Sequence, residues 1–319
     1  MHRKEVGHKV VLVALAANIA IAVTKFVAAA ITSSAAMLSE GVHSLVDTIN
    51  ELLLLYGIKR AAKPPDRRHP FGYGRELYFW SFVVALLVLV LGTGASFYEG
   101  TMRLLHPEPV RNPSLNYAVL AAAFLFEGAS WWFTLRAFRK TKGRQTWFEA
   151  FRSSKDPSTF TVLFEDTAAL AGLVIAFAGV AGTHAFDLPI LDALASYGIG
   201  TVLAVSSLLL ARETKELLLG EPAHPHIRQS ILRIAANDDG VRTANGVLTT
   251  QMGPNEIIAA LSAEFEDELS TSEIEACVNR IECAIKAAHP DVAVLFVKPQ
   301  TAGTWQRRVA AAEERAAGS

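Results

Sequence analysis

The sequence predicts an α-helical membrane protein with six transmembrane helices, followed by a small α+β domain. Of the 319 residues, 51% are hydrophobic and only 19% are charged, whereas about a quarter of the residues are charged in ordinary globular domains. The long apolar runs fall within residues 1–212, and residues 213–319 have the composition of a soluble domain. The net charge of -1 excludes a generally basic surface, so no nucleic-acid partner is expected.

The apolar runs are long enough for membrane helices, which need about 20 mostly apolar residues. The third run is the strongest because Phe82 to Leu91 contains no polar side chain, and the second is the weakest because several ionisable residues interrupt it. The first run is too long for a cleavable signal, and no small-residue cleavage site follows it. The expected spans are 9–31, 37–58, 77–102, 115–138, 160–182 and 190–211.

The basic residues predict the topology. Lys and Arg are concentrated before the first span, between the second and third spans, and between the fourth and fifth spans. Since positive loops remain on the cytoplasmic side, we expect both termini to be cytoplasmic, or to face the matrix in an organelle. In a bacterium the protein would lie in the plasma or inner membrane.

The tail predicts an αββαβ, ferredoxin-like domain over residues 213–300. A helix over 224–236 is followed by strands over 241–250 and 256–266, and Ser270-Thr271-Ser272-Glu273 is a capping-box pattern that starts another helix. A last strand covers 291–297, and the Ala-, Glu- and Arg-rich residues 301–319 predict a frayed helix or disorder. Cys277 and Cys283 are too few for a disulfide scaffold, and we expect both to be small core residues.

The second span carries a pair of residues that suits a divalent metal. His43 and Asp47 are four residues apart and therefore share one helix face. An imidazole and a carboxylate on one face can bind the same cation; alternatively, they hydrogen-bond to each other and steady helix packing. Asn50 lies near the same face, whereas Glu51 is expected at the cytoplasmic end of the span.

Ionisable residues also occur in the fourth and fifth spans, and such residues inside a membrane are functional candidates by default. Glu165 and Asp166 lie within or at the edge of the fifth apolar run, although one of them could instead mark the membrane surface. Glu127 falls near the middle of the fourth span, either as a proton carrier or as a packing contact to Asn18, Thr24 or a serine. Lys25 in the first span pairs with Glu127 or extends to the membrane surface.

Two carboxylates and a histidine from different helices suit zinc or manganese. Tetrahedral zinc takes four ligands, of which His43, Asp47 and Asp166 supply three. A transport site must also release its ion, so a water molecule or a weak fourth ligand such as Glu165 fits.

Several segments together resemble the cation diffusion facilitator family over nearly the whole chain. They are residues 37–47 (MLSEGVHSLVD), 69–74 (HPFGYG) and 192–200 (DALASYGIG). Residues 126–129 (FEGA), 156–159 (DPST) and 165–169 (EDTAA) are similar to the branch typified by the mitochondrial zinc transporter of animals.

The resemblance implies a proton-coupled exporter of divalent cations that works as a homodimer. Its ligands would match His43, Asp47 and Asp166, and the histidine of the pair on the second span indicates zinc. Val162 stands where the family has a second histidine, and Glu165 is the substitute that this branch shares.

The other metal sites of the family are only partly matched. In the loop before the third span, Asp66 is retained as a weak second site, but Tyr73 replaces the expected histidine. In the tail, the side chains at the family's ligand positions, Ser262, Val297 and Pro299, are not useful metal ligands. We expect His224 and His226 to be solvated residues of a linker. Dimerisation through the tail remains expected, whereas metal sensing by the tail is not.

Two hypotheses follow from these residues. The first is a zinc/proton antiporter, with manganese, iron, cobalt or cadmium as the other candidate ions and no cofactor. The alternative is a membrane-anchored interaction or regulatory protein derived from a transporter. The missing histidine of the fifth span and the unmatched tail sites support it, whereas the polar residues of the second span argue against it. No nucleophile–base motif, phosphate-binding loop or cofactor fingerprint predicts an enzyme. The expected partners are the lipid bilayer and a second copy of the chain.

Overall fold

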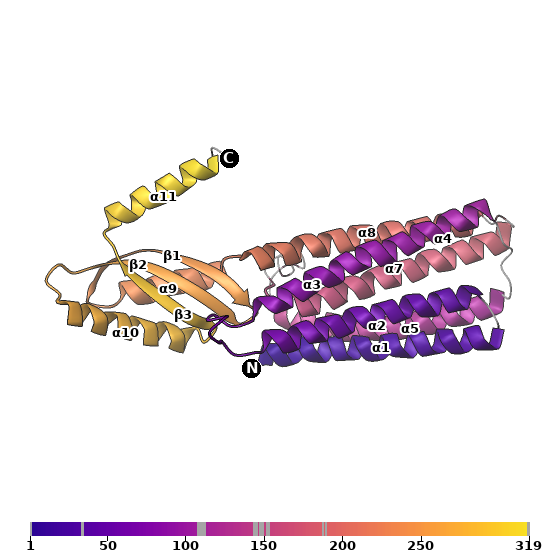
Figure 1. Cartoon of the computed structure of the whole chain (residues 1–319), viewed down its shortest axis with the longest axis horizontal. Helices are drawn as coiled ribbons and strands as arrows, with labels where there is room; N and C mark the ends of the chain where they lie inside the picture. Colours follow the sequence, from indigo (N-terminus) through magenta and orange to yellow (C-terminus); the bar gives the residue numbers. More distant parts are fainter. Residues whose placement is uncertain are drawn as a thin grey trace. The chain divides into compact units, whose positions relative to one another are not determined.

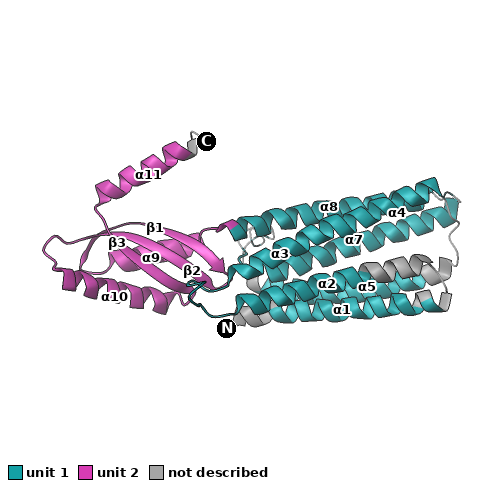
Figure 2. Ribbon diagram, in the orientation of Figure 1, with its two compact units in different colours: residues 1–218 teal, residues 219–319 magenta. Residues whose placement is uncertain are grey.

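The computed structural model of the chain describes residues 2–32, 35–106, 113–142, 146, 150, 154–186, 188 and 190–317. It consists of two compact units, residues 1–218 and residues 219–319 (Figure 2). The first unit is built from long helices, and the second combines helices with a small sheet (Figure 1).

The helical unit follows the six apolar runs closely. The third run is divided by a π-helical segment, η1, which separates α3 from α4. Gly220, which has a positive φ of 111°, directly follows the last residue of α8 and ends this helix. The elements are α1 (His2–Thr32), α2 (Ala35–Ala61), α3 (Arg75–Leu87), η1 (Val88–Thr93), α4 (Gly94–Leu105), α5 (Pro113–Lys142), α7 (Pro157–Phe186) and α8 (Ile190–Leu219).

Five segments in the described part of the chain are long and apolar enough to cross a membrane. They are His8–Val27, Arg75–Leu105, Tyr117–Lys140, Pro157–Phe186 and Ile190–Leu219. These five correspond to five of the six expected spans. The 27 residues of α2 also suffice in length, but this helix carries Asp47, Glu51, Lys59 and Arg60. A sixth span is therefore an inference about α2 and does not follow from its hydropathy.

The helices pack so that α1 contacts α2, α5 and α7, while α5 also contacts α7. Small residues bring α7 and α8 together at one point: a Cβ on Gly179 would lie only 2.5 Å from the Cβ of Ala195. Large apolar side chains such as Val174, Phe177 and Val205 are more than half exposed. Such an apolar outer surface is typical of helices that face lipid.

The second unit has the order that the tail sequence predicts. Its elements are α9 (Pro225–Ala236), β1 (Val241–Gly253), β2 (Glu256–Phe265), α10 (Thr271–Ala288), β3 (Val292–Pro299) and α11 (Ala302–Ala317). The sheet order is β1-β2-β3, with β2 antiparallel to β1 and parallel to β3. Ser270 and Glu273 form the predicted capping box at the start of α10.

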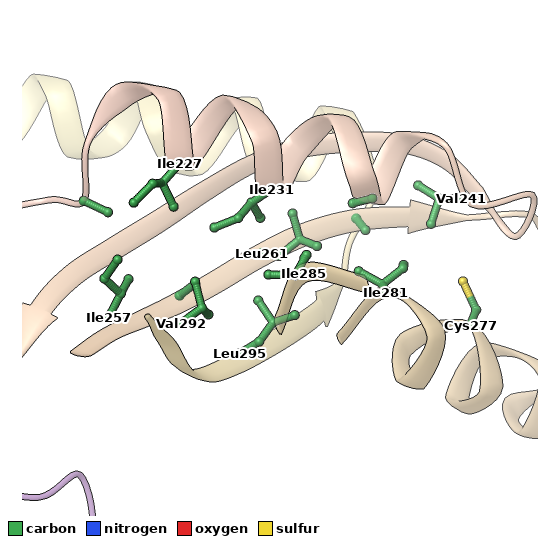
Figure 3. Close-up of a cluster of buried hydrophobic side chains, with 14 of the residues drawn as sticks. Ile227, Ile231, Val241, Ile257, Leu261, Cys277, Ile281, Ile285, Val292 and Leu295 are labelled. Atoms are coloured by element: carbon green, nitrogen blue, oxygen red, sulfur yellow. The ribbon is translucent and has the colours of Figure 1, made fainter. Parts of the chain in front are cut away.

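The core of this unit joins α9 and α10 to one face of the sheet (Figure 3). Ile231 of α9, Leu261 of β2 and Ile285 of α10 are fully buried in it. Cys277 is buried in the same core and donates to Asp238 Oδ1, but Cys283 is exposed, so the expectation of two core cysteines is wrong for Cys283. Residues 302–317 form the helix α11, and Trp305 on it packs against Gly246 of β1.

Candidate ion-binding site

Helix α2 presents its polar residues to the interior of the helical unit. Asp47 is half-buried, while Asn50 and Glu51 are each only 3% exposed. The side chain of His43, the fourth residue of this stripe, lies outside the described residues. Glu51 is not at the end of the helix, because α2 continues for ten further residues to Ala61. Glu51 therefore lies inside the helical unit and not at the end of α2, and its depth in the membrane stays a prediction.

Helix α7 carries the second group of predicted ligands. The helix begins at Pro157, where Asp156 Oδ1 accepts from the backbone N–H and the hydroxyl of Ser158. From that start, Glu165 and Asp166 are eight and nine residues along the helix, which places them about 12–14 Å from its end. Asp166 is 4% exposed, so its carboxylate lies inside the helical unit.

A hydroxyl of the neighbouring helix holds Asp166. Ser130 on α5 is buried and donates its hydroxyl hydrogen to Asp166 Oδ2 at 2.9 Å. Charge-assisted hydrogen bonds of this kind fix the orientation of a carboxylate and are stronger than neutral ones. Ser130 was not among the predicted site residues. No sequence signal separates it from the other serines of the spans.

The carboxylates of three helices act on one another electrostatically. Glu165 experiences repulsion from Asp47 of α2, from Asp166 beside it, and from Glu127 of α5. Asp47, Glu165 and Asp166 are therefore close enough to act on one another electrostatically, and their role as metal ligands stays a prediction. Within the described residues, no three His, Cys, Asp or Glu side chains are already arranged around a single metal position.

Glu51 has partners that the sequence did not indicate. Asn18 on α1 donates from Nδ2 to Glu51 Oε1 at 2.7 Å, and both side chains are buried. Asn18 was expected as a packing contact of Glu127, but its side-chain amide hydrogen-bonds to Glu51 instead. The hydroxyl of Thr24, another candidate, donates to the backbone oxygen of Ala20.

Lys25 is a buried cation among the described residues of this region. Its Nζ donates to Ser44 Oγ at 2.9 Å, and its positive charge acts on Glu127. Lys25 is 8% exposed, so the expected alternative in which it extends to the membrane surface is wrong.

Asp66 organises the loop between α2 and α3. Its Oδ1 accepts from the backbone N–H groups of Arg68 and His69, both at 2.8 Å, and its Oδ2 accepts from the Tyr73 hydroxyl at 2.7 Å. The Tyr73 hydroxyl is the main reason why the pKa of Asp66 lies below its usual value. Tyr73 therefore occupies one Asp66 oxygen at the position where the family resemblance predicts a histidine.

In the second unit, His224 and His226 stack with ring centroids 5.5 Å apart. Of the tail positions considered as ligands, Ser262 is buried and donates to Gln300 Oε1. Val297 and Pro299 have no side-chain ligand atoms. Among the described residues of the second unit, these contacts indicate no metal ligand beyond the two histidines that the sequence already showed.

Comparisons with known proteins identify relatives for most of the chain. A family model described as the cation efflux transmembrane domain matches residues 11–219. The proton-coupled zinc antiporter SLC30A9, mitochondrial, of Mus musculus is 35% identical over 266 residues, covering 82% of this chain and 47% of the relative. Metal tolerance protein C4 of Arabidopsis thaliana is 29% identical over 240 residues, covering 75% of this chain and 52% of the relative.

A bacterial relative is matched over most of both chains. The cation-efflux pump FieF of Cronobacter sakazakii is 28% identical over 268 residues, covering 83% of each chain. By contrast, the chain spans about half the length of the mouse and plant relatives. The names of the three relatives describe a zinc antiporter, a metal tolerance protein and a cation-efflux pump.

Proposed function

The chain belongs to the cation efflux family, and on this premise we propose that it exports zinc in exchange for protons. It is a multi-pass integral membrane protein, as its apolar helices and its relatives indicate. The finer assignment to zinc and to protons rests on the similarity to the zinc antiporter, together with the site residues. Manganese, iron, cobalt and cadmium are the other ions to compare.

The proposed zinc ligands are His43 and Asp47 of α2 and Asp166 of α7, with Glu165 or Asn50 completing the site. One observation carries this proposal: carboxylates from two helices act on one another inside the helical unit. Like charges that gather in a low-dielectric interior are costly unless a cation compensates them. A transported divalent ion supplies that compensation, and a neutral imidazole with carboxylates suits zinc.

The exchange with protons follows from the chemistry of the ligands. Zinc binds to neutral imidazole and to ionised carboxylates, so protons must leave the site before the metal enters. On the releasing side, protonation of the same groups removes ligands and expels the ion. Glu127 either relays these protons or serves packing, and the charge of Lys25 acts on it from α1.

The proposed topology has six spans, with α2 as the most polar one, and cytoplasmic termini. In a bundle, the polar side of α2 is shielded from lipid, because Asn50 and Glu51 are buried and Glu51 accepts from Asn18 of α1. The loop residue Asp66 remains a weak second site. We also propose that the protein forms a homodimer through its second unit.

The alternative of a membrane-anchored regulatory protein with little transport receives no support from the comparisons, since the named relatives are transporters. The missing histidine at Val162 was its main argument. Glu165 offers a carboxylate in the same stretch of α7, so the absence of that histidine does not imply the absence of a site.

The test is zinc uptake into proteoliposomes that contain a zinc-sensitive dye. Asp47→Ala and Asp166→Ala should each abolish uptake while the protein still elutes as a folded species, because each variant removes a charged ligand. Asp239→Ala is the matched control, since Asp239 is an exposed aspartate of the second unit, and it should transport at the wild-type rate.

The same vesicles test the exchange. Collapse of an imposed pH gradient with an ionophore should slow wild-type uptake. Wild-type rates in Asp47→Ala or Asp166→Ala would remove that residue from the site. Uptake that is indifferent to pH on both faces would show a uniporter and refute the antiport mechanism.

A further inference from the structure

Glu51 is a buried carboxylate with one satisfied and one unsatisfied oxygen. Its side chain is 3% exposed, and Asn18 Nδ2 donates to Oε1 at 2.7 Å. Among the described residues, Oε2 is fully buried and has no hydrogen-bond partner. A buried carboxylate oxygen without a donor is costly, so this oxygen requires a positively charged or hydrogen-donating partner that the described residues do not supply.

A second oxygen of the same kind belongs to Glu165 of α7. Within the described part of the chain, Glu165 Oε1 is buried and also has no hydrogen-bond partner. Among the charged groups that act on Glu51, Glu165 acts most strongly. Leu54 of α2 and Val162 of α7 belong to one buried cluster. Glu51 and Glu165 are each three residues, about one helical turn, from these two positions. The two carboxylates therefore come from neighbouring stretches of α2 and α7, and each has a buried oxygen that is unpaired among the described residues.

The spacing places this pair beside the proposed zinc site. Glu51 follows Asp47 by four residues, so it lies on nearly the same face of α2 and about 6 Å nearer the C-terminal end of that helix. Glu165 directly precedes Asp166, and its charge interacts with Asp47 as well as with Glu51. Glu165 can thus serve as a ligand for an ion beside Asp47 and also for an ion beside Glu51.

We propose that Glu51 and Glu165 form a second, all-oxygen binding station for the transported divalent cation, one helical turn from the site at Asp47. Asn18 is its positioning residue, because its amide fixes Glu51 Oε1 and leaves Oε2 to the ion. This proposal rests on the proposed transport function. It adds to that function a ligand, Glu51, and a position at which the ion binds before or after the first site.

The ligand chemistry sets the ions that this station prefers. Carboxylate oxygens without an imidazole suit harder divalent ions such as manganese, whereas a site that includes His43 suits zinc. A site with only these carboxylate ligands binds the cation weakly enough to release it to the neighbouring site. Manganese alone is therefore the appropriate probe, because it should remain bound when the ligands of the first site are removed.

The experiment measures manganese binding to the purified full chain in lipid nanodiscs, by the loss of the electron paramagnetic resonance signal of the free ion. The background variant combines Asp47→Asn with Asp166→Asn, which removes the first site. We expect this background to retain one weakly bound manganese ion per chain. Adding Glu51→Gln should weaken that binding at least about tenfold, as is typical when a metal site loses important support.

Two variants separate a ligand from a structural role. Glu51→Gln keeps the oxygen that Asn18 needs, so the helix contact survives, and Glu51→Asp keeps the charge and should bind manganese within about threefold of the background. Glu216→Gln makes the same change at a half-exposed site on α8 that pairs with Arg212, and it should leave binding unchanged.

The outcomes separate this proposal from the transport function. If the background binds no manganese, or if adding Glu51→Gln leaves binding unchanged, the second station does not exist. If Glu51→Gln changes only the pH dependence of transport and not manganese binding, Glu51 carries a proton and the proposal is wrong. Loss of zinc uptake in Asp47→Ala and Asp166→Ala would leave the transport function standing in each of these cases.

Discussion

Ser130 offers a way to test the role of Asp166 without removing a charge. Its hydroxyl donates to Asp166 Oδ2 at 2.9 Å, and the two side chains are 2% and 4% exposed. Ser130→Ala removes only this donor and leaves the carboxylate in place. If Asp166 is a metal ligand, the variant should bind zinc less well, because the carboxylate must then be ordered when the ion arrives.

The magnitude follows from the energy of such a bond. Hydrogen bonds to charged groups contribute about 1.5–3 kcal/mol, and 1.4 kcal/mol corresponds to a factor of about ten. Partners that orient a metal ligand are in turn worth about 10- to 100-fold in metal affinity. We therefore expect the KM for zinc to rise roughly 10- to 100-fold in Ser130→Ala, with a smaller change in kcat.

The assay is initial zinc uptake into proteoliposomes as a function of zinc concentration. Ser130→Thr retains a hydroxyl and should restore most of the affinity. Ser207→Ala is the matched control: Ser207 is also 2% exposed, but its hydroxyl donates to the backbone oxygen of Leu203 within α8. If Ser130→Ala and Ser207→Ala raise KM equally, or if neither raises it by more than about twofold, Asp166 is not held for metal binding by Ser130.

Two further predictions concern ion preference and pH. His43→Asp should shift the relative uptake rates from zinc towards manganese or iron, because a carboxylate replaces an imidazole; unchanged ratios across a panel of metals would show that His43 does not select the ion. Arg280 donates two hydrogen bonds to Asp238 and lowers the pKa of that carboxyl to about 2 from a usual 3.8. Because this pKa is depressed on folding, the stabilisation is present above about pH 4 and is lost as the pH falls towards 2. Arg280 is 58% exposed, so Asp238→Asn should cost the second unit about 1–2 kcal/mol at pH 7 after allowance for solvent screening, and less near pH 2. Amide hydrogen exchange of β1 and α10 in the full chain measures this cost, and equal protection in both proteins at pH 7 would contradict it.

The fold could be predicted largely because its signals are local. Apolar runs of sufficient length gave the helices of the first unit, and the Ser270–Glu273 capping box and the apolar face behind it gave α10. Two features of the fold could not be predicted from local sequence signals. The π-helical segment Val88–Thr93 has the same apolar composition as the helices around it, and the helix α11 is stabilised in part by the contact of Trp305 with Gly246.

The candidate site was predictable only where a charge interrupts an apolar run. Asp47, Glu127, Glu165 and Asp166 stand out for that reason, since charges at membrane depth are rare. The partners of these charges are ordinary polar residues. Asn18 and Ser130 each lie more than thirty positions from the carboxylate that they contact. Helix packing alone determines such pairs, so no pattern within one helix can reveal them.

Glu51 illustrates how a sequence argument can miss the partner of a buried charge. A carboxylate near the end of an apolar run is usually at the membrane surface, because burial of a lone charge is expensive. That reasoning assumes that the charge has no partner. Asn18 donates to one oxygen of Glu51, and Glu165 lies close enough to repel it. This repulsion makes the buried pair informative, because carboxylates that lie together in a protein interior are stabilised by a bound cation or by protonation, and the proposal assigns this role to the transported ion.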